Sequence, residues 1–385
     1  MRIAIPASRS VSPALVAGLI VLVFVVIAAS AMLHTSTTFD EIVFFAVGAR
    51  GFHTGDFSLV TDHPRLPQYL YGLPAFLSGI RYPSEAILHF DMMPRYMYAR
   101  ELLWSMGNPA EALMMKSRLV AIALGAGTVA CTFAFARRHM GAAAALIAAV
   151  LVAFLPDMLA HSGIAYNDIA LTFGYLLSVY AIDSAARKPT VPLAALAGLA
   201  IALTVCTKYS GVVLGPVAVV LVALEAIAGR WGDRAWRHRI ALASLVTTVV
   251  VYLSIAIVYQ GDWRLTQFAE GFVESLGGTL GRPAFLFGEQ WNGGRSYFFP
   301  VLFFLKTPAA LHVLMALAIV GAWLALRGKP WREWASHGAR APAVGAALFL
   351  AGLVTSQLNI GFRHALPMLP LLCILVAQGL EPLWN

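Results

Sequence analysis

Residues 39–74 read FDEIVFFAVGARGFHTGDFSLVTDHPRLPQYLYGLP, and they follow an apolar run that ends near Leu33. Asp40 and Glu41 stand at the start of this stretch, and a second polar group, TDHPR at residues 61–65, follows within it. Ionisable residues next to an apolar segment are costly to place and usually mark a functional pathway. The stretch therefore indicates chemistry at a membrane surface.

The composition is that of a membrane protein. Of the 385 residues, 59% are hydrophobic and 12% are charged, against about 25% charged in ordinary soluble proteins. Mean hydropathy is +0.76. These values and the repeated apolar runs predict an all-α polytopic membrane protein. Basic residues in short cytoplasmic loops explain the net charge of +8, so no nucleic-acid partner is expected.

A helix needs about 20 apolar residues, roughly 30 Å, to cross a bilayer. By this measure residues 1–385 form a single transmembrane domain with about ten spans. The expected spans are 12–33, 114–136, 141–156, 167–183, 191–207, 210–229, 240–259, 298–326, 341–358 and 366–383.

The charges in the connections predict the orientation. Basic residues collect in alternate connections, and Arg2 and Arg9 precede the first span. The positive-inside rule then places the N-terminus in the cytoplasm, and an even number of spans returns the C-terminus to the same side. Residues 34–113 and 260–297 become the two large external loops. The Tyr, Trp, Met and Pro content of the first loop predicts short helices at the membrane interface.

In this topology the unusual polar residues converge on the external face. They are Asp40, Glu41, His161, Asn167, Asp168, Lys208, Lys306, Arg363 and His364. Lys306 is expected about 12 Å inside the span 298–326, at the rise of an α-helix. This distribution on one side of the membrane favours an active face outside the cytoplasm.

These residues also have structural interpretations. Asp40 and Glu41 suit a helix N-terminus through the helix dipole, and Asp168 suits an N-cap. Lys208 and Lys306 suit snorkelling to lipid headgroups. Snorkelling is favoured for Lys208, whereas the expected depth of Lys306 favours a functional role.

Acids and bases on the outer face together fit one type of reaction. A carboxylate can remove a proton from an attacking hydroxyl, and Lys and Arg can hold a phosphate before and after it leaves. At headgroup level this pairing suits transfer from a lipid-linked phosphate donor to a hydroxyl acceptor. A nucleotide donor is disfavoured because the sequence has no phosphate-binding Gly-rich strand-turn-helix motif.

Several motifs in order resemble glycosyltransferase family 39, which includes the protein O-mannosyltransferases and the bacterial aminoarabinose transferases. They are FDE at 39–41, GDF at 55–57, DHP at 62–64, NDIALT at 167–172, TKYS at 207–210, LKTP at 305–308 and LNIGFRHALP at 358–367. The resemblance covers nearly the whole chain. The family usually has a second proline after His-Pro, and here Arg65 stands in its place.

The resemblance implies the GT-C fold, with a transmembrane core and interfacial helices from the first external loop. It implies a polyprenyl-phosphate sugar donor, a hydroxyl acceptor and an inverting single displacement. The implied site residues are Asp40 as catalytic base with Asp168 and Glu41 as further acids, Lys306, Arg363 and Lys208 at the donor phosphate, and His63, Asn167 and His364 as loop or substrate contacts. A divalent metal is left open, with Glu41 as the candidate ligand.

The alternative is a membrane transporter or flippase of a lipid-linked or small-molecule substrate. Transporters place ionisable groups near the bilayer midplane and often show internal repeats. Here the polar residues lie toward the outer face and no repeat is visible, which favours a glycosyltransferase of the inner (cytoplasmic) membrane with its site facing the periplasm. The sequence names neither the sugar nor the acceptor, whether protein, glycan or lipid.

Overall fold

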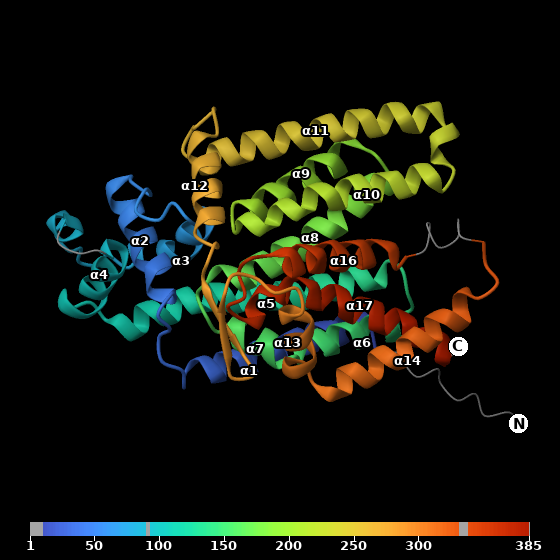
Figure 1. The fold of residues 1–385 in the computed structure, drawn as a ribbon, viewed down its shortest axis with the longest axis horizontal. Helices are drawn as coiled ribbons and strands as arrows, with labels where there is room; N and C mark the ends of the chain where they lie inside the picture. Colours follow the sequence, from blue (N-terminus) through green and yellow to red (C-terminus); the bar gives the residue numbers. More distant parts are fainter. Residues whose placement is uncertain (1–10, 90–92, 331–337, 385) are drawn as a thin grey trace, which may run out of the picture.

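The computed structural model describes residues 11–89, 93–330 and 338–384. The fold is a bundle of long helices along one axis, with shorter helices gathered at one end (Figure 1). We call this end of the bundle the loop end. The shorter helices there are α2 (Glu41–Thr54), α3 (Leu66–Phe76), α4 (Pro94–Arg100) and α12 (Thr266–Gly277).

Seven helices of the described residues are long and apolar enough to cross a membrane. They are α1 (Pro13–Met32), α5 (Ala110–Arg137), α8 (Asn167–Arg187), η3 with α10 (Tyr209–Val213 and Leu214–Ile227), α11 (Arg234–Val258), α14 (Ala309–Leu326), and η5, α17 and η6 (Phe362–Met368, Leu369–Leu380 and Glu381–Leu383). Six of them match expected spans, and α14 covers the second part of the span expected over 298–326. The chain is therefore a multi-pass helical membrane protein, as predicted.

The remaining expected spans are short or broken. The span expected over 141–156 is a bent pair, α6 (Ala142–Ala153) and α7 (Pro156–Ser162), whose axes differ by 61°. Pro156 explains the break, because proline cannot donate the hydrogen bond that would continue α6. α9 (Val191–Val205) and α16 (Arg340–Thr355) are apolar but have only 15 and 16 residues. The described residues thus hold up to eight candidate spans by length and composition, fewer than the ten expected.

The helix expected over residues 298–326 is interrupted at Thr307-Pro308. There α13 (Phe298–Lys306) ends and α14 begins, and Thr307 has an extended backbone with φ −86° and ψ 146°. A residue before proline avoids the α conformation, and Pro308 itself lacks an N–H. Lys306 is consequently the exposed last residue of a short helix. Its expected place deep inside one long span is corrected.

The first long loop folds into helices, as expected. α2 crosses α3 at two glycines, where a Cβ atom on Gly48 would lie 2.0 Å from the carbonyl oxygen of Gln68, and one on Gly72 would lie 2.3 Å from the carbonyl carbon of Gly48. Buried side chains of α2, α4 and the following π-helix form a separate apolar cluster, which fixes these helices against one another. The remaining elements of this loop are a 3-10 helix, Glu85–His89, and the π-helix, Glu101–Ser105.

The second long loop contains α12 and an antiparallel hairpin of two strands, β1 (Pro283–Leu286) and β2 (Glu289–Asn292). The hairpin is the only strand structure among the described residues. α12 packs closely on the first loop, because a Cβ atom on Gly271 would lie 2.4 Å from the carbonyl oxygen of Thr61 and 2.2 Å from the Tyr209 hydroxyl. The two long loops therefore meet beside the start of α10.

α8 is the centre of the bundle, with 72% of its spanning window buried, the largest share among the candidate spans. It packs against α5, α9, α10, α16 and η5. Because the start of α8 and the start of η5 both lie at the loop end, their polar residues are brought together inside the protein.

The opposite end of the bundle is tied by buried ion pairs that sequence reasoning did not identify. Asp183, near the end of α8, lies 3.3 Å from Arg340 of α16 and 2.9 Å from Arg187. Arg340 also pairs with Glu225 of α10. A buried charge without a partner is strongly destabilising, so these pairs hold three helix ends together. A short helix, η4 (Arg230–Gly232), leads from here into α11.

Candidate active site

The site is built around Asp168, the second residue of α8. Tyr166, with an extended backbone, is the N-cap residue of α8, so the N-cap interpretation of Asp168 is wrong. The Asp168 side chain is only 3% exposed, and its Oδ1 lies 2.6 Å from the Nζ of Lys208. Lys208 follows α9 with an extended backbone, which carries its side chain back to α8. Its ammonium group therefore faces a buried carboxylate rather than lipid headgroups.

Arg363 lies between two carboxylates. Its Nη2 is 3.3 Å from Oδ2 of Asp40, and its Nε is 3.7 Å from Oδ2 of Asp168. The guanidinium carbon also lies 5.0 Å from the centre of the Tyr166 ring. Arg363 thus joins the start of α2 to the start of α8 through one guanidinium group.

Asp40 is the more accessible of the two acids. It is the N-cap residue of α2 but makes no side-chain hydrogen bond to the helix backbone. Its side chain is 32% exposed, and Tyr96 of α4 donates a hydrogen bond of 3.3 Å to its Oδ1. The Tyr96 ring stacks on Phe39 with 4.3 Å between ring centres. A carboxylate with this exposure is able to accept a proton from an incoming group.

Asn167 and two histidines border the same region. His364 Nδ1 lies 3.3 Å from Lys208 Nζ. Within the part of the chain that the structure describes, His364 Nε2 and both polar atoms of the buried Asn167 side chain have no hydrogen-bond partner. Unsatisfied buried polar atoms are uncommon in native proteins, and water or a ligand often completes them. The His63 ring packs on Phe44, with 5.4 Å between ring centres.

The turn that contains His63 is fastened by α4. Arg95 of α4 lies 2.5 Å from Oδ1 of Asp62. Burial would raise the pKa of Asp62, but the positive charge of His63 when it is protonated and the hydrogen bond from Arg95 outweigh burial and lower it. Burial lowers the pKa of His63, and the positive charges of Lys208 and Arg95 lower it further. The negative charge of Asp62 raises it but does not outweigh them. His63 is therefore neutral at pH 7.

Acidification is expected to destabilise the loop end through His63. Because its pKa is lowered from 6.5 in the folded protein, the unfolded chain binds the proton more readily, and stability falls as the pH drops below 6.5. Asp62, with a pKa below 3.8, titrates outside this window. His63→Gln should flatten the dependence of the thermal unfolding midpoint on pH between about 7.5 and 5. Parallel pH profiles for wild type and variant would contradict the expectation.

Glu41, expected beside Asp40 in the site, is instead fully buried in an ion pair with α5. Its Oε1 lies 2.6 Å from Arg118 Nε and accepts a hydrogen bond of 2.9 Å from the backbone N–H of Ala165. Its Oε2 accepts hydrogen bonds from Arg118 Nη2 and from the backbone N–H of Thr38. These bonds fill the roughly four acceptor positions of a carboxylate. The arrangement suits a structural anchor for α2 and does not suit a catalytic acid or a metal ligand.

The acids of the site are paired with cations of the chain itself. Asp40 and Asp168 face Arg363 and Lys208. Within residues 11–89, 93–330 and 338–384, no group of three or more His, Cys, Asp or Glu side chains is arranged to hold a metal ion. The residues present therefore do not fit a dedicated divalent-metal site.

Lys306 does not join this cluster. It is exposed at the end of α13, and its charge acts on Asp157 at the start of α7. Of the three cations expected at a donor phosphate, the structure brings Lys208 and Arg363 together and leaves Lys306 apart.

Sequence reasoning missed Arg118, Tyr96 and Arg95. Arg118 carried a signal, because an arginine inside an apolar helix is costly and needs a partner. Tyr96 and Arg95 carried none beyond their place in an interfacial segment. Arg65, which departs from the family pattern, is buried and donates a hydrogen bond of 3.0 Å to Oε1 of Gln260, so it anchors the first loop to the second.

A helical membrane core with a polar site at one end is the arrangement of the GT-C fold, and solved structures of this class are similar over most of the chain. ArnT from Cupriavidus metallidurans bound to undecaprenyl phosphate matches with a TM-score of 0.63 and 15% identity, over 94% of this chain and 59% of that chain. The apo oligosaccharyltransferase of Archaeoglobus fulgidus matches with a TM-score of 0.59 and 13% identity, over 94% of this chain and 50% of that chain. The predicted GT-C fold is confirmed.

The chain belongs to the dolichyl-phosphate-mannose-protein mannosyltransferase family, whose model matches residues 18–269. A comparison with curated proteins found no match. The chain spans between 50% and 59% of the length of the two solved structures described above. The resemblance drawn from the sequence motifs is thereby confirmed at the level of family and fold.

Proposed function

We propose that this chain is a membrane glycosyltransferase that moves a sugar from a polyprenyl-phosphate donor to a hydroxyl acceptor. The observation that carries the proposal is the position of Arg363 between Asp40 and Asp168, with Lys208 beside the second acid. A phosphate needs such cations, and an attacking hydroxyl needs such a base. The similar ArnT structure is bound to undecaprenyl phosphate, and the family is named for dolichyl-phosphate-mannose, which supports this class of donor.

Asp40 is the general base of the proposed reaction. The acceptor oxygen attacks the anomeric carbon and gives its proton to Asp40. The bond from that carbon to the phosphate oxygen breaks on the opposite side, and polyprenyl phosphate leaves with the bonding electrons. A single displacement of this kind inverts the anomeric configuration. Asp168, buried beside Arg363 and Lys208, positions the two cations.

Arg363 and Lys208 are proposed to hold the donor phosphate. Preorganised cations stabilise the negative charge that grows on the phosphate as the sugar leaves. The planar guanidinium can donate two hydrogen bonds to neighbouring phosphate oxygens. His364 and Asn167, which have polar atoms without partners among the described residues, are proposed to complete the donor contacts. His63 shapes this side of the site through its packing.

Arg363→Ala is expected to weaken binding of undecaprenyl phosphate by about 10- to 100-fold, because a hydrogen bond to a charged group contributes about 1.5–3 kcal/mol. Titration of the lipid into the purified protein in detergent measures the effect. Arg264→Ala removes an exposed arginine at the same end and should bind like wild type. Equal affinities for Arg363→Ala and wild type would exclude the phosphate contact.

The acceptor is proposed to be a hydroxyl group of a protein, a glycan or a lipid. Asp40 is the accessible acid, so the acceptor would approach on its side of the site. Tyr96 and Phe39 border this approach through their contacts with Asp40 and with each other. The first long loop is therefore proposed to influence which acceptor is used.

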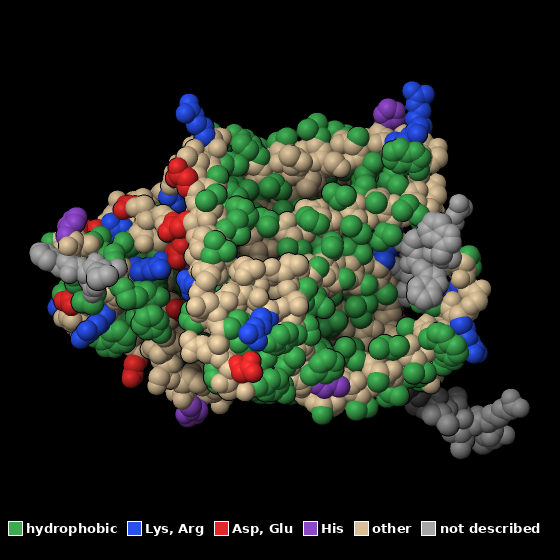
Figure 2. Space-filling model, in the orientation of Figure 1, with side chains coloured by type: hydrophobic (Ala, Val, Ile, Leu, Met, Phe, Trp, Pro, Cys, Tyr) green, Lys and Arg blue, Asp and Glu red, His purple; other side chains and the backbone are tan. Residues whose placement is uncertain are grey.

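The site is proposed to face the outside of the inner (cytoplasmic) membrane, with the N-terminus in the cytoplasm. On the face drawn in Figure 2, acidic side chains lie toward the loop end, whereas the opposite end shows only basic ones and histidine. An excess of Lys and Arg favours the cytoplasmic side. α1 begins and α17 ends at this basic end (Figure 1). Arg2 and Arg9, which support the same orientation, lie outside the described residues.

Purified protein incubated with labelled polyprenyl-phosphate sugars and a set of hydroxyl acceptors tests the proposed function. The expected result is consumption of at least one donor, with release of polyprenyl phosphate and labelling of an acceptor. The same protein in liposomes tests the alternative. Movement of intact lipid-linked sugar across the bilayer without its consumption would overturn the proposal in favour of a flippase.

A further inference from the structure

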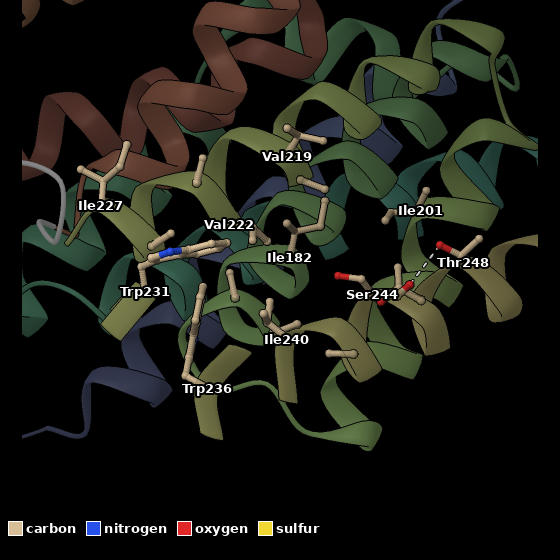
Figure 3. A pocket seen from close by; sticks show the side chains of 18 residues that line it. Ile182, Ile201, Val219, Val222, Ile227, Trp231, Trp236, Ile240, Ser244 and Thr248 are labelled. Carbon is tan, nitrogen blue, oxygen red and sulfur yellow. Dashed lines mark hydrogen bonds between the residues drawn. The ribbon is translucent and has the colours of Figure 1, made fainter. Parts of the chain in front are cut away.

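A cavity of about 610 Å³ lies between α10 and α11, in the half of the bundle away from the loop end. Its walls come from α8, α9, α10 and α11, and Figure 3 shows Val222 of α10 and Ile240 of α11 facing it from opposite sides. Its volume is in the range of about 300–1,000 Å³ typical of ligand sites. Ile182 in its wall stands about 21 Å along α8 from Asp168 at the rise of a helix, so the cavity is separate from the candidate active site.

Small side chains open this cavity. Alanines line it on all four helices, among them Ala185, Ala197, Ala223 and Ala243. α11 packs closely on α9, where a Cβ atom on Gly198 would lie 2.8 Å from a carbonyl oxygen of α11. Large side chains at these positions would fill the space between α10 and α11. Because the positions are alanines, the space stays open.

The walls offer little polar surface. The Thr247 hydroxyl donates to the carbonyl oxygen of Ala194 at 3.0 Å, and the Thr248 hydroxyl donates to that of Ser244 at 3.0 Å. Both hydroxyl groups are therefore satisfied by helix carbonyls, whereas the buried indole N–H of Trp236 has no hydrogen-bond partner among the described residues. An apolar chain fits this lining better than a polar ligand, because a polar ligand would lose its bonds to water without replacement.

The end of the cavity near η4 is bordered by tryptophan and arginine. Trp231 and Trp236 line it, and the guanidinium carbon of Arg237 lies 5.7 Å from the centre of the Trp231 ring. Residues 230–240 contain four arginines and one acid, Asp233. Arg234 and Arg237 are exposed and form no ion pair within the described residues. The mouth of the cavity therefore carries excess positive charge.

The position of the cavity relates these features to the bilayer. α8, α10 and α11 all belong to candidate membrane spans, and the arginines stand where α10 ends and α11 begins. Tryptophan and arginine prefer the headgroup region at the ends of spans. The apolar walls thus lie at the depth of the acyl chains, and the arginines lie at the depth of the lipid phosphates.

We propose that this cavity binds one anionic glycerophospholipid from the leaflet at the basic end of the bundle. One acyl chain occupies the cavity between α10 and α11, and the phosphate lies against Arg234 and Arg237. Anionic headgroups are attracted to such basic segments. A zwitterionic headgroup is attracted less, because its own positive group is repelled by the same arginines. The bound lipid fills the space that separates α11 from α10.

Lipid retention by the purified full-length protein tests the proposal. Native mass spectrometry counts the bound lipids after the protein is equilibrated in mixed micelles of phosphatidylglycerol and phosphatidylcholine. Wild type is expected to retain one phosphatidylglycerol in preference to phosphatidylcholine. Ala223→Phe, which fills the cavity, and Arg237→Glu, which reverses the charge at its mouth, should each lose this lipid.

Matched controls lie on α14 and at its C-cap residue. Ala316→Phe enlarges an exposed alanine of a span outside the cavity. Arg327→Glu removes an arginine that lies 5.3 Å from the centre of the Trp323 ring, which is the same kind of contact at residues that do not line this cavity. Both should retain the lipid. If Ala223→Phe fails to fold, as judged by thermal unfolding in detergent, Ala218→Leu provides a smaller filling change.

Three outcomes would overturn the proposal. One is no preference for phosphatidylglycerol in wild type, which would mean that the arginines select no headgroup. Another is equal loss of lipid from the cavity variants and the α14 variants. The third is a polyprenyl lipid, rather than phosphatidylglycerol, that remains in wild type and is lost from Ala223→Phe, because the occupant would then be a donor tail.

Discussion

Asp40→Asn is expected to abolish sugar transfer while the protein still folds and binds its donor. The amide has the shape of the carboxylate but cannot accept the acceptor's proton, so kcat should fall by about 10²- to 10⁴-fold. The Asp40 side chain is 32% exposed, and its contacts with Arg363 and Tyr96 are 3.3 Å long, so the substitution breaks no tightly buried pair. Turnover of a labelled polyprenyl-phosphate sugar at saturating donor measures the effect.

Glu270→Gln on α12 is the matched control for this prediction. It makes the same change from carboxylate to amide on an exposed residue at the loop end, and it should keep wild-type turnover. Donor affinity separates the proposed roles, because Asp40→Asn loses kcat without weakening donor binding, whereas Arg363→Ala loses affinity. Full turnover by Asp40→Asn would exclude this residue as the base.

Arg118→Leu is expected to lower the free energy of unfolding by about 3–5 kcal/mol, because it leaves the Glu41 carboxylate buried without a counter-ion. Glu41 is fully buried, and Arg118 is only 4% exposed. Arg118 also donates hydrogen bonds of 2.9 Å to the carbonyl oxygens of Thr35 and Ser36, so the segment before Asp40 should loosen as well. Denaturant unfolding in mixed micelles measures the loss.

Two further variants separate the buried pair from a general effect of charge. Lys116→Leu removes a lysine from the exposed face of the same helix and should change stability little. Adding Glu41→Gln to Arg118→Leu should recover part of the loss, since no buried charge is then left without a partner. If Arg118→Leu alone is as stable as wild type, the ion pair does not fasten α2 to α5.

The apolar segments were enough to predict a helical membrane protein, because hydropathy depends on the composition of a whole segment. They were not enough to predict where the helices break. Pro308 divides one apolar run into two helices, and Pro156 bends another by 61°. A window of about 20 residues averages over such breaks. The hairpin in the second loop had no sequence signal beyond glycines at its turns.

Part of the site could be predicted because the topology places the ends of several segments on one side of the membrane. Asp168, Lys208 and Arg363 come from three such segments, and the structure brings them together. Adjacency in the sequence predicts that Glu41 shares the site with Asp40. Successive residues of a helix point about 100° apart, so Glu41 turns into the protein toward α5. Its partner Arg118 is 77 residues away, a pairing that only the fold creates.

The resting site holds its cations and acids in mutual contact, with Arg363 already engaged by Asp40 and Asp168. On the proposed function, an arriving donor phosphate must compete with Asp40 for the guanidinium. Once the phosphate takes that place, Asp40 is released to receive the acceptor. We therefore expect compulsory-order kinetics, with the lipid-linked sugar binding first and the acceptor second. An acceptor that meets the empty enzyme would find its base occupied.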